Sequence, residues 1–263
     1  MNILDTIVAR KKEEVALAKQ QLSLAELKDS PYFYRRVPSF KENILMLGST
    51  GIIAEFKRKS PSKGDIHAGA RVDLIVPGYE KAGVAGISIL TDHDFFGGNM
   101  TDLSLGREMC DLPIIRKEFI IDSYQVYEAK SIGASAILLI GAILDKNRTL
   151  ELAQLANELG MEVLFEIHDE KEMEQLNSCV QLVGINNRNL KTFEVDLNKS
   201  AQLASMLPSG MVPIAESGIG SPEDYLLLRE VGFKGFLMGE YFMKNDDPAL
   251  ACQNFCNNIR SKI

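Results

Sequence analysis

The sequence predicts a closed (β/α)8 TIM barrel, an α/β fold, preceded by a helical extension. Eight short apolar runs rich in β-branched residues recur from residue 51 onward, and segments with helical periodicity separate most of them. Strands that are apolar throughout are typical of parallel sheets covered by helices. The chain length of 263 residues suits one such barrel. We therefore expect one barrel domain over residues 1–263, with residues 1–48 as an N-terminal helical extension.

An open, doubly wound sheet is the alternative α/β fold. Such sheets usually carry a glycine-rich G-x-G-x-x-G turn after their first strand. In this chain the corresponding segment, residues 57–64, reads KRKSPSKG. This difference, together with the eight repeated units, favours the barrel.

The elements follow from local patterns along the chain. Leu4, Ile7 and Val15 form an apolar stripe on a charged N-terminal segment, which predicts a helix. Two S-x-x-E capping boxes, which begin at Ser23 and Ser39, predict further short helices. Helices are also expected within residues 123–133, 149–160, 170–176 and 221–232. The expected strands lie within residues 51–56, 85–90, 112–117, 134–140, 161–167, 181–186, 211–217 and 234–239.

The composition limits the possible partners and compartments. The chain is 46% hydrophobic and 25% charged, and its formal net charge is −7, which argues against binding to duplex nucleic acid. The four cysteines lack the spacing of a metal site and are interpreted as structural. No signal-peptide core is present, and no apolar run approaches the roughly 20 residues of a membrane span. We therefore expect a cytoplasmic protein that binds neither membranes nor metals.

Charged and amide side chains stand where the predicted strands end. Glu55 and Lys57 are two residues apart, and they share a face because side chains alternate along a strand. Any one of these residues could be an ordinary solvated rim residue, but ionised groups are costly to desolvate in such numbers. Because barrel active sites lie at the C-terminal ends of the strands, we expect an active site there. Other strands end in Arg116, Lys117, Glu118, Glu166, Asn186, Arg188 and Glu216.

The last two strands indicate a phosphate site. The segments ESGI and MGEYFM follow them, and Gly218 and Gly239 would let backbone N–H groups approach an anion. His93 and His168 lie just beyond strand ends and are interpreted as loop residues rather than ligands. The residues thus predict an enzyme for a small phosphorylated anion that uses Lys and Glu as acid and base, with no cofactor.

Two other functions remain open at this point. A different phosphate barrel, an isomerase or an aldolase, could use a strand lysine covalently as a Schiff base. A sugar-phosphate sensor built on a barrel would keep the phosphate loops, but it would have no need for an acid–base pair.

The motifs taken together resemble the indole-3-glycerol phosphate synthase family across essentially the whole chain. They are IIAEFKRKSPSKG, ILTDHDFFGG, LPIIRKEFIID, GINNRNLKTFEVD and IAESGI, in this order. The resemblance implies a lyase of tryptophan biosynthesis. Such an enzyme closes an indole ring on 1-(2-carboxyphenylamino)-1-deoxyribulose 5-phosphate, with loss of carbon dioxide and water. It also implies possible association with other enzymes of that pathway.

The resemblance also assigns roles to residues. Lys117 matches the general acid, Glu166 the general base and Lys57 a second acid, while Glu55, Asn186 and Glu216 would orient hydroxyls and lysines. The segment SPSKG is expected to close over the ligand. The substrate-binding residues implied are Ser60, Phe96, Phe119, Arg188, Ser217, Gly218, Gly239 and Glu240, the last through its backbone N–H.

Overall fold

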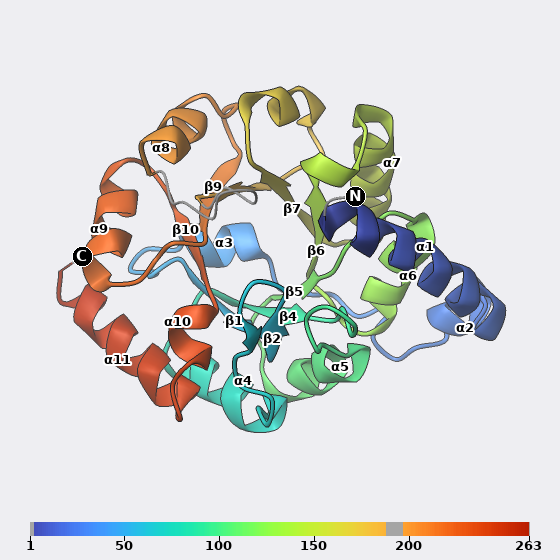
Figure 1. The fold of residues 1–263 in the computed structure, drawn as a ribbon, viewed down its shortest axis with the longest axis horizontal. Helices are drawn as coiled ribbons and strands as arrows, with labels where there is room; N and C mark the ends of the chain where they lie inside the picture. The colour runs from blue at the N-terminus through green and yellow to red at the C-terminus, as the bar shows by residue number, and fades with distance from the viewer. Residues whose placement is uncertain (1–2, 188–196, 263) are drawn as a thin grey trace.

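A computed structural model describes residues 3–187 and 197–262, and it confirms the predicted barrel (Figure 1). Eight parallel strands pair in the closed order β1-β10-β9-β8-β7-β6-β5-β4. Each lies within a segment that the sequence marks as a strand. They are β1 (Ile52–Phe56), β4 (Gly86–Leu90), β5 (Ile114–Lys117), β6 (Ala136–Ile140), β7 (Glu162–Ile167), β8 (Leu182–Asn186), β9 (Val212–Glu216) and β10 (Gly235–Met238).

Helices surround the barrel, as Figure 1 shows. The segment expected as a helix within residues 170–176 is instead a 3-10 helix, which Asp169 caps by accepting the Lys171 N–H. Among the described residues, no helix has both the length and the apolar content needed to cross a membrane. The barrel helices are α4 (Val72–Lys81), α5 (Met100–Met109), α6 (Ser123–Ser131), α7 (Lys146–Glu158), α8 (Leu197–Ser205), α9 (Pro222–Glu230), α10 (Glu240–Met243) and α11 (Pro248–Arg260). The 3-10 helices are Gly141–Ile143 and Glu170–Gln175.

The N-terminal extension contains α1 (Ile3–Gln21), α2 (Leu24–Lys28) and α3 (Phe40–Leu45). Ser23 forms the predicted reciprocal capping box at α2. Ser39 caps α3 by accepting the Glu42 N–H, but its hydroxyl also donates to Glu162 of β7 at 2.7 Å. The Glu162 carboxylate further accepts the Phe40 N–H, so the cap of α3 is shared with the barrel.

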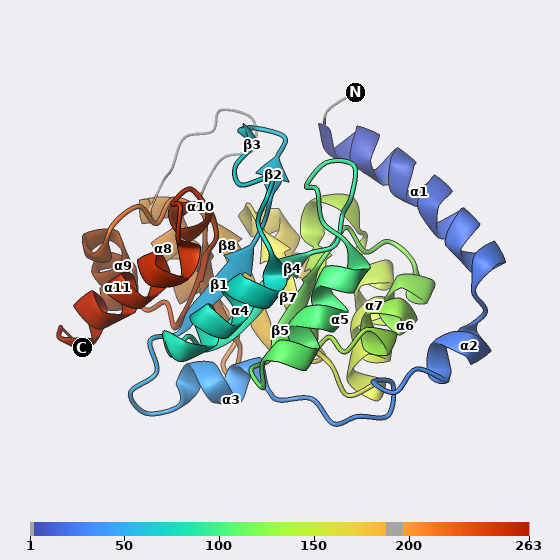
Figure 2. The same cartoon turned by 90° about the horizontal axis from the view of Figure 1, so that it is seen from below.

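The two ends of the barrel carry different elements. Helix α3 covers the N-terminal end, where Phe40 and Ile44 join the apolar cluster inside the barrel (Figure 2). A short antiparallel hairpin, β2 (Lys59–Ser60) with β3 (Gly64–Asp65), rises from the C-terminal end. Packing therefore closes one end of the barrel and leaves the other available for a site.

Candidate active site

A cavity of about 630 Å³ opens at the C-terminal end of the barrel. Its walls come from the strand ends, α1, the β2–β3 hairpin and α10. The structure brings together there all the catalytic and substrate-binding residues assigned from the sequence except Arg188, which lies outside the described residues. These residues are Glu55, Lys57, Ser60, Phe96, Lys117, Phe119, Glu166, Asn186, Glu216, Ser217, Gly218, Gly239 and Glu240. Arg116 does not line the cavity and instead contacts Glu128 of α6.

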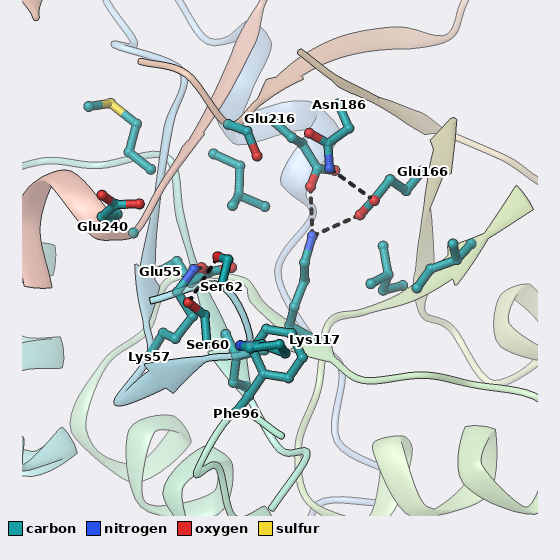
Figure 3. A pocket seen from close by; sticks show the side chains of 18 of the residues that line it. Glu55, Lys57, Ser60, Ser62, Phe96, Lys117, Glu166, Asn186, Glu216 and Glu240 are labelled. Atoms are coloured by element: carbon teal, nitrogen blue, oxygen red, sulfur yellow. Dashed lines mark hydrogen bonds and ion pairs between the residues drawn. The ribbon is translucent and has the colours of Figure 1, made fainter. Parts of the chain in front are cut away.

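Lys117 stands at the centre of the cavity between two carboxylates (Figure 3). Its Nζ lies 2.6 Å from Oε2 of Glu216 and 3.3 Å from Oε2 of Glu166. The amide Nδ2 of Asn186 donates to the other oxygen of Glu166, Oε1, at 3.3 Å. Side chains from three separate strands therefore bring two carboxylates into contact with one ammonium.

The pKa values of the two carboxyls are shifted in opposite directions, although both contact the same ammonium. Burial alone would lower the pKa of Lys117, but Glu216 and Glu166 outweigh it and raise that pKa above its usual range. Burial would raise the pKa of Glu166, yet the charges of Lys117 and His168 lower it. Burial and the neighbouring Glu166 charge raise the pKa of Glu216 to about 7. Glu166 is thus the permanent anion, and Glu216 is the group that titrates near neutrality.

This arrangement predicts a pH dependence of stability. A carboxyl whose pKa rises from 4.5 unfolded to about 7 folded binds its proton more tightly in the folded state. Its contribution to the free energy of unfolding is therefore full below about pH 4.5 and is lost as the pH rises through about 7. Urea unfolding of the wild type and of Glu216→Gln over this range should show the wild type losing stability relative to the variant. A constant difference between them would contradict the assignment.

The first strand places a second ion pair in the cavity. Glu55 and Lys57 share a face as predicted, and Lys57 Nζ lies 2.6 Å from Glu55 Oε1. The side chain of Glu55 is almost fully buried, and its other oxygen accepts the Ser88 hydroxyl at 3.4 Å. Gly239 lies against this carboxylate, because a Cβ built there would stand 2.6 Å from Glu55 Oε1. A side chain larger than glycine at 239 would therefore displace the pair.

Gly184 likewise leaves room for a carboxylate, that of Glu216. A Cβ at Gly184 of β8 would stand 2.0 Å from Glu216 Oε1. The strand can thus accommodate the Glu216 side chain only because residue 184 lacks one. The sequence shows this glycine in the motif GIN, but the strand pattern does not indicate that the Glu216 side chain occupies the space beside it.

His168 lines the cavity, which sequence reasoning missed by treating it as a loop residue. Its Nε2 lies 3.3 Å from Glu166 Oε1, and its Nδ1 lies 3.6 Å from Glu172 Oε2. Burial would lower the pKa of His168, but Glu172 and Glu166 raise it above its usual value. Both carboxylates therefore favour the protonated form of the imidazole beside Glu166. Its position two residues after Glu166 on the same strand end was the available signal, since such residues share a face.

The predicted phosphate end has an unusual backbone. Ser217 adopts a positive φ of 65° and Gly218 one of 75°. A positive φ in a residue other than glycine is uncommon and is stored strain that surrounding contacts must maintain. Asn187, which is buried, donates from Nδ2 to the Ser217 carbonyl at 2.8 Å. This hydrogen bond connects the end of β8 to the loop that follows β9 and helps to hold that loop in place.

Two lysines lie near α10 at this cavity. Lys63 of the hairpin loop lies 3.6 Å from Glu240 Oε1, and Lys244, which follows α10, lines the cavity. Neither lysine was among the predicted site residues. Both stand outside the strand ends that guided the sequence analysis, so only the folded arrangement reveals them.

Comparison with known proteins gives a consistent result. The family model of indole-3-glycerol phosphate synthase matches residues 4–255. A protein of that name from Bacteroides thetaiotaomicron is 48% identical over 98% of this chain and 99% of its own length. Another of that name, from Laribacter hongkongensis, is 42% identical over 95% of this chain and 97% of its own.

A solved structure resembles the fold at low sequence identity. It is a mutant tryptophan synthase alpha-subunit from Pyrococcus furiosus, with a TM-score of 0.59 and 12% identity. It covers 81% of this chain and 99% of its own chain. This similarity supports the barrel architecture.

Proposed function

This chain belongs to the indole-3-glycerol phosphate synthase family of carboxy-lyases, enzymes of tryptophan biosynthesis, and from that premise we propose which of its residues carry the reaction. The substrate proposed is 1-(2-carboxyphenylamino)-1-deoxyribulose 5-phosphate. The ring carbon that bears the carboxylate attacks the sugar ketone, and carbon dioxide and water leave. The observation that carries the proposal is the contact of Lys117 with both Glu216 and Glu166 inside one cavity.

Ring closure needs a proton donor at the ketone oxygen, which gains negative charge as the new carbon–carbon bond forms. Lys117 is held as an ammonium by its two carboxylates, so it is protonated when substrate arrives. It donates to that oxygen, while release of carbon dioxide returns the bonding electrons to the ring. A positioned acid or base typically contributes about 10²–10⁴-fold to the rate.

Dehydration needs one proton removed and one hydroxyl protonated. Glu166 is anionic and stands 3.3 Å from Lys117, so it can take the proton. Lys57, on the opposite side of the cavity in Figure 3, protonates the leaving hydroxyl. Glu55, Asn186 and Glu216 hold the lysines and the base in place through the contacts described above.

Substrate binding divides between two ends of the cavity. The phosphate is assigned to Ser217, Gly218, Gly239 and the backbone of Glu240, near Lys63 and Lys244. The aryl ring is assigned to Phe96 and Phe119, whose ring centroids are 5.8 Å apart. Ser60, the last residue of β2, lines the cavity next to the hairpin loop, and closure of that loop over the ligand is part of the proposal.

The direct test is turnover. Purified protein mixed with the carboxyphenylamino substrate should generate indole fluorescence, and borohydride added during turnover should trap no lysine adduct. A covalent adduct with loss of activity would instead indicate Schiff-base chemistry.

A cytoplasmic location and association with other enzymes of the pathway belong to the same proposal. Co-elution from a native extract tests that association.

A further inference from the structure

A lysine lies on the buried face of the N-terminal helix. The buried residues of α1 are Ile7, Lys11 and Val15, which are spaced four apart and therefore share one face. Lys11 is only 3% exposed, although its neighbours on this face are apolar. Burial of an ammonium costs free energy unless partners compensate for it, so its surroundings need an explanation.

Three carboxylates surround the Lys11 ammonium. Nζ lies 2.8 Å from Oδ2 of Asp92 and 3.2 Å from Oε1 of Glu118. It also lies 2.6 Å from Oε2 of Glu14 on the same helix. Asp92 follows β4 and Glu118 follows β5, and both are buried. Lys11 therefore ties α1 to the ends of two adjacent barrel strands.

The same two buried carboxylates also hold the backbone of the aromatic residues in the cavity wall. Oδ1 of Asp92 accepts the N–H groups of Phe95 at 2.8 Å and Phe96 at 3.0 Å. Oε1 of Glu118 accepts the N–H of Phe119 at 2.8 Å. Phe96 and Phe119 both line the cavity. One ammonium thus contacts both groups that fix the backbone at the two rings.

We propose that Lys11 is a positioning residue that sets the spacing of Phe96 and Phe119 and thereby the affinity of the cavity for the aryl part of its ligand. The identification of that part as a carboxyphenyl ring rests on the proposed function. Helix α1 contributes Ile3, Leu4 and Ile7 to the same cavity. Lys11 therefore aligns two walls of the cavity at once, one from the helix and one from the strand ends.

Charge balance explains why loss of Lys11 would move this wall. Asp92 and Glu118 both contact the Lys11 ammonium, so without it two buried negative charges would lie close together. Like charges repel strongly in a medium of low dielectric constant. Nearby cations compensate poorly. Arg116 lies 4.0 Å from Glu118 but bonds Glu128, and Arg10 pairs with the exposed Asp94. The two carboxylates would separate and take the backbone of Phe96 and Phe119 with them.

Steady-state kinetics and ligand binding of Lys11→Met test the proposal, with Lys12→Met as the matched control because Lys12 is exposed on the same helix. We expect Lys11→Met to raise KM for the substrate by about tenfold or more while kcat changes by less than about threefold. Inorganic phosphate, a competitive inhibitor, probes the phosphate end of the cavity. Its inhibition constant should be the same for Lys11→Met and the wild type. Lys12→Met should match the wild type in all three.

Two further variants keep the test decisive. Lys11→Arg restores the positive charge and should recover most of the affinity. If Lys11→Met alone does not fold, Lys11→Met combined with Glu118→Gln removes the repulsion, and it retains the acceptor for the Phe119 N–H. That double variant should show the same selective rise in KM, though a smaller one. The proposal would be overturned if Lys11→Met weakened the binding of substrate and of phosphate equally, or if it lowered kcat alone.

A binding measurement separates this inference from the proposed function. The fluorescence of 2-aminobenzoate reports its binding without turnover. Selective loss of 2-aminobenzoate binding in Lys11→Met would support the positioning role of Lys11, even if the protein closed no indole ring. Conversely, a protein with wild-type turnover and unchanged 2-aminobenzoate binding in Lys11→Met would retain the proposed function and exclude the positioning role.

Discussion

Replacement of Lys117 by alanine is expected to lower kcat by about two to four orders of magnitude, the usual contribution of a positioned acid. The ammonium is the group between Glu166 and Glu216, and no other lysine nitrogen among the described residues is paired with either carboxylate. Alanine removes the donor at the ketone oxygen and leaves two buried carboxylates without their cation. Indole fluorescence under substrate saturation measures kcat directly.

The control for this substitution is Lys234→Ala. Lys234 is exposed and immediately precedes β10, so it lies at the opposite end of the barrel. It should retain wild-type kcat. Circular dichroism of both variants establishes that they fold. Turnover of folded Lys117→Ala within about tenfold of the wild type would contradict the role of general acid.

Sequence patterns predicted the barrel because each strand is buried on both faces and reads as an uninterrupted apolar run. The strand ends were predictable for a related reason: Glu55, Lys117 and Glu166 each lie within the last two residues of a strand. Parallel topology then brings these ends together whatever the details of packing. The sequence pattern of each strand agrees with its place in the barrel, so prediction of the strand ends was enough to predict many residues of the cavity.

What could not be predicted depends on contacts between distant segments. Its spacing from Ile7 and Val15 places Lys11 on the buried face of α1, but only the fold shows that Asp92 and Glu118 are its partners. Glu162 lies at the beginning of β7, where nothing in the sequence indicates that it caps α3. Such roles depend on which segments meet in space, and periodicity along one segment carries no information about that.

Glu166→Gln should also lower kcat by about two to four orders of magnitude, because an amide cannot accept the proton that dehydration releases. The substitution preserves shape, and the remaining carbonyl oxygen can still accept the Asn186 amide. Positioning is therefore retained while the base is lost. The control is Glu170→Gln, because Glu170 is exposed just beyond the same strand. Nearly normal turnover by folded Glu166→Gln would place the base elsewhere.

The same variant tests the electrostatics independently of catalysis. The charge of Glu166 helps raise the pKa of Glu216, so its removal should bring that pKa down from about 7. The loss of unfolding free energy between about pH 4.5 and 7 should then shrink in Glu166→Gln compared with the wild type. If turnover fell while this pH dependence stayed intact, Glu166 would be a base whose charge does not reach Glu216. A fall in both would establish that Glu166 is the base and that its charge also raises the pKa of Glu216.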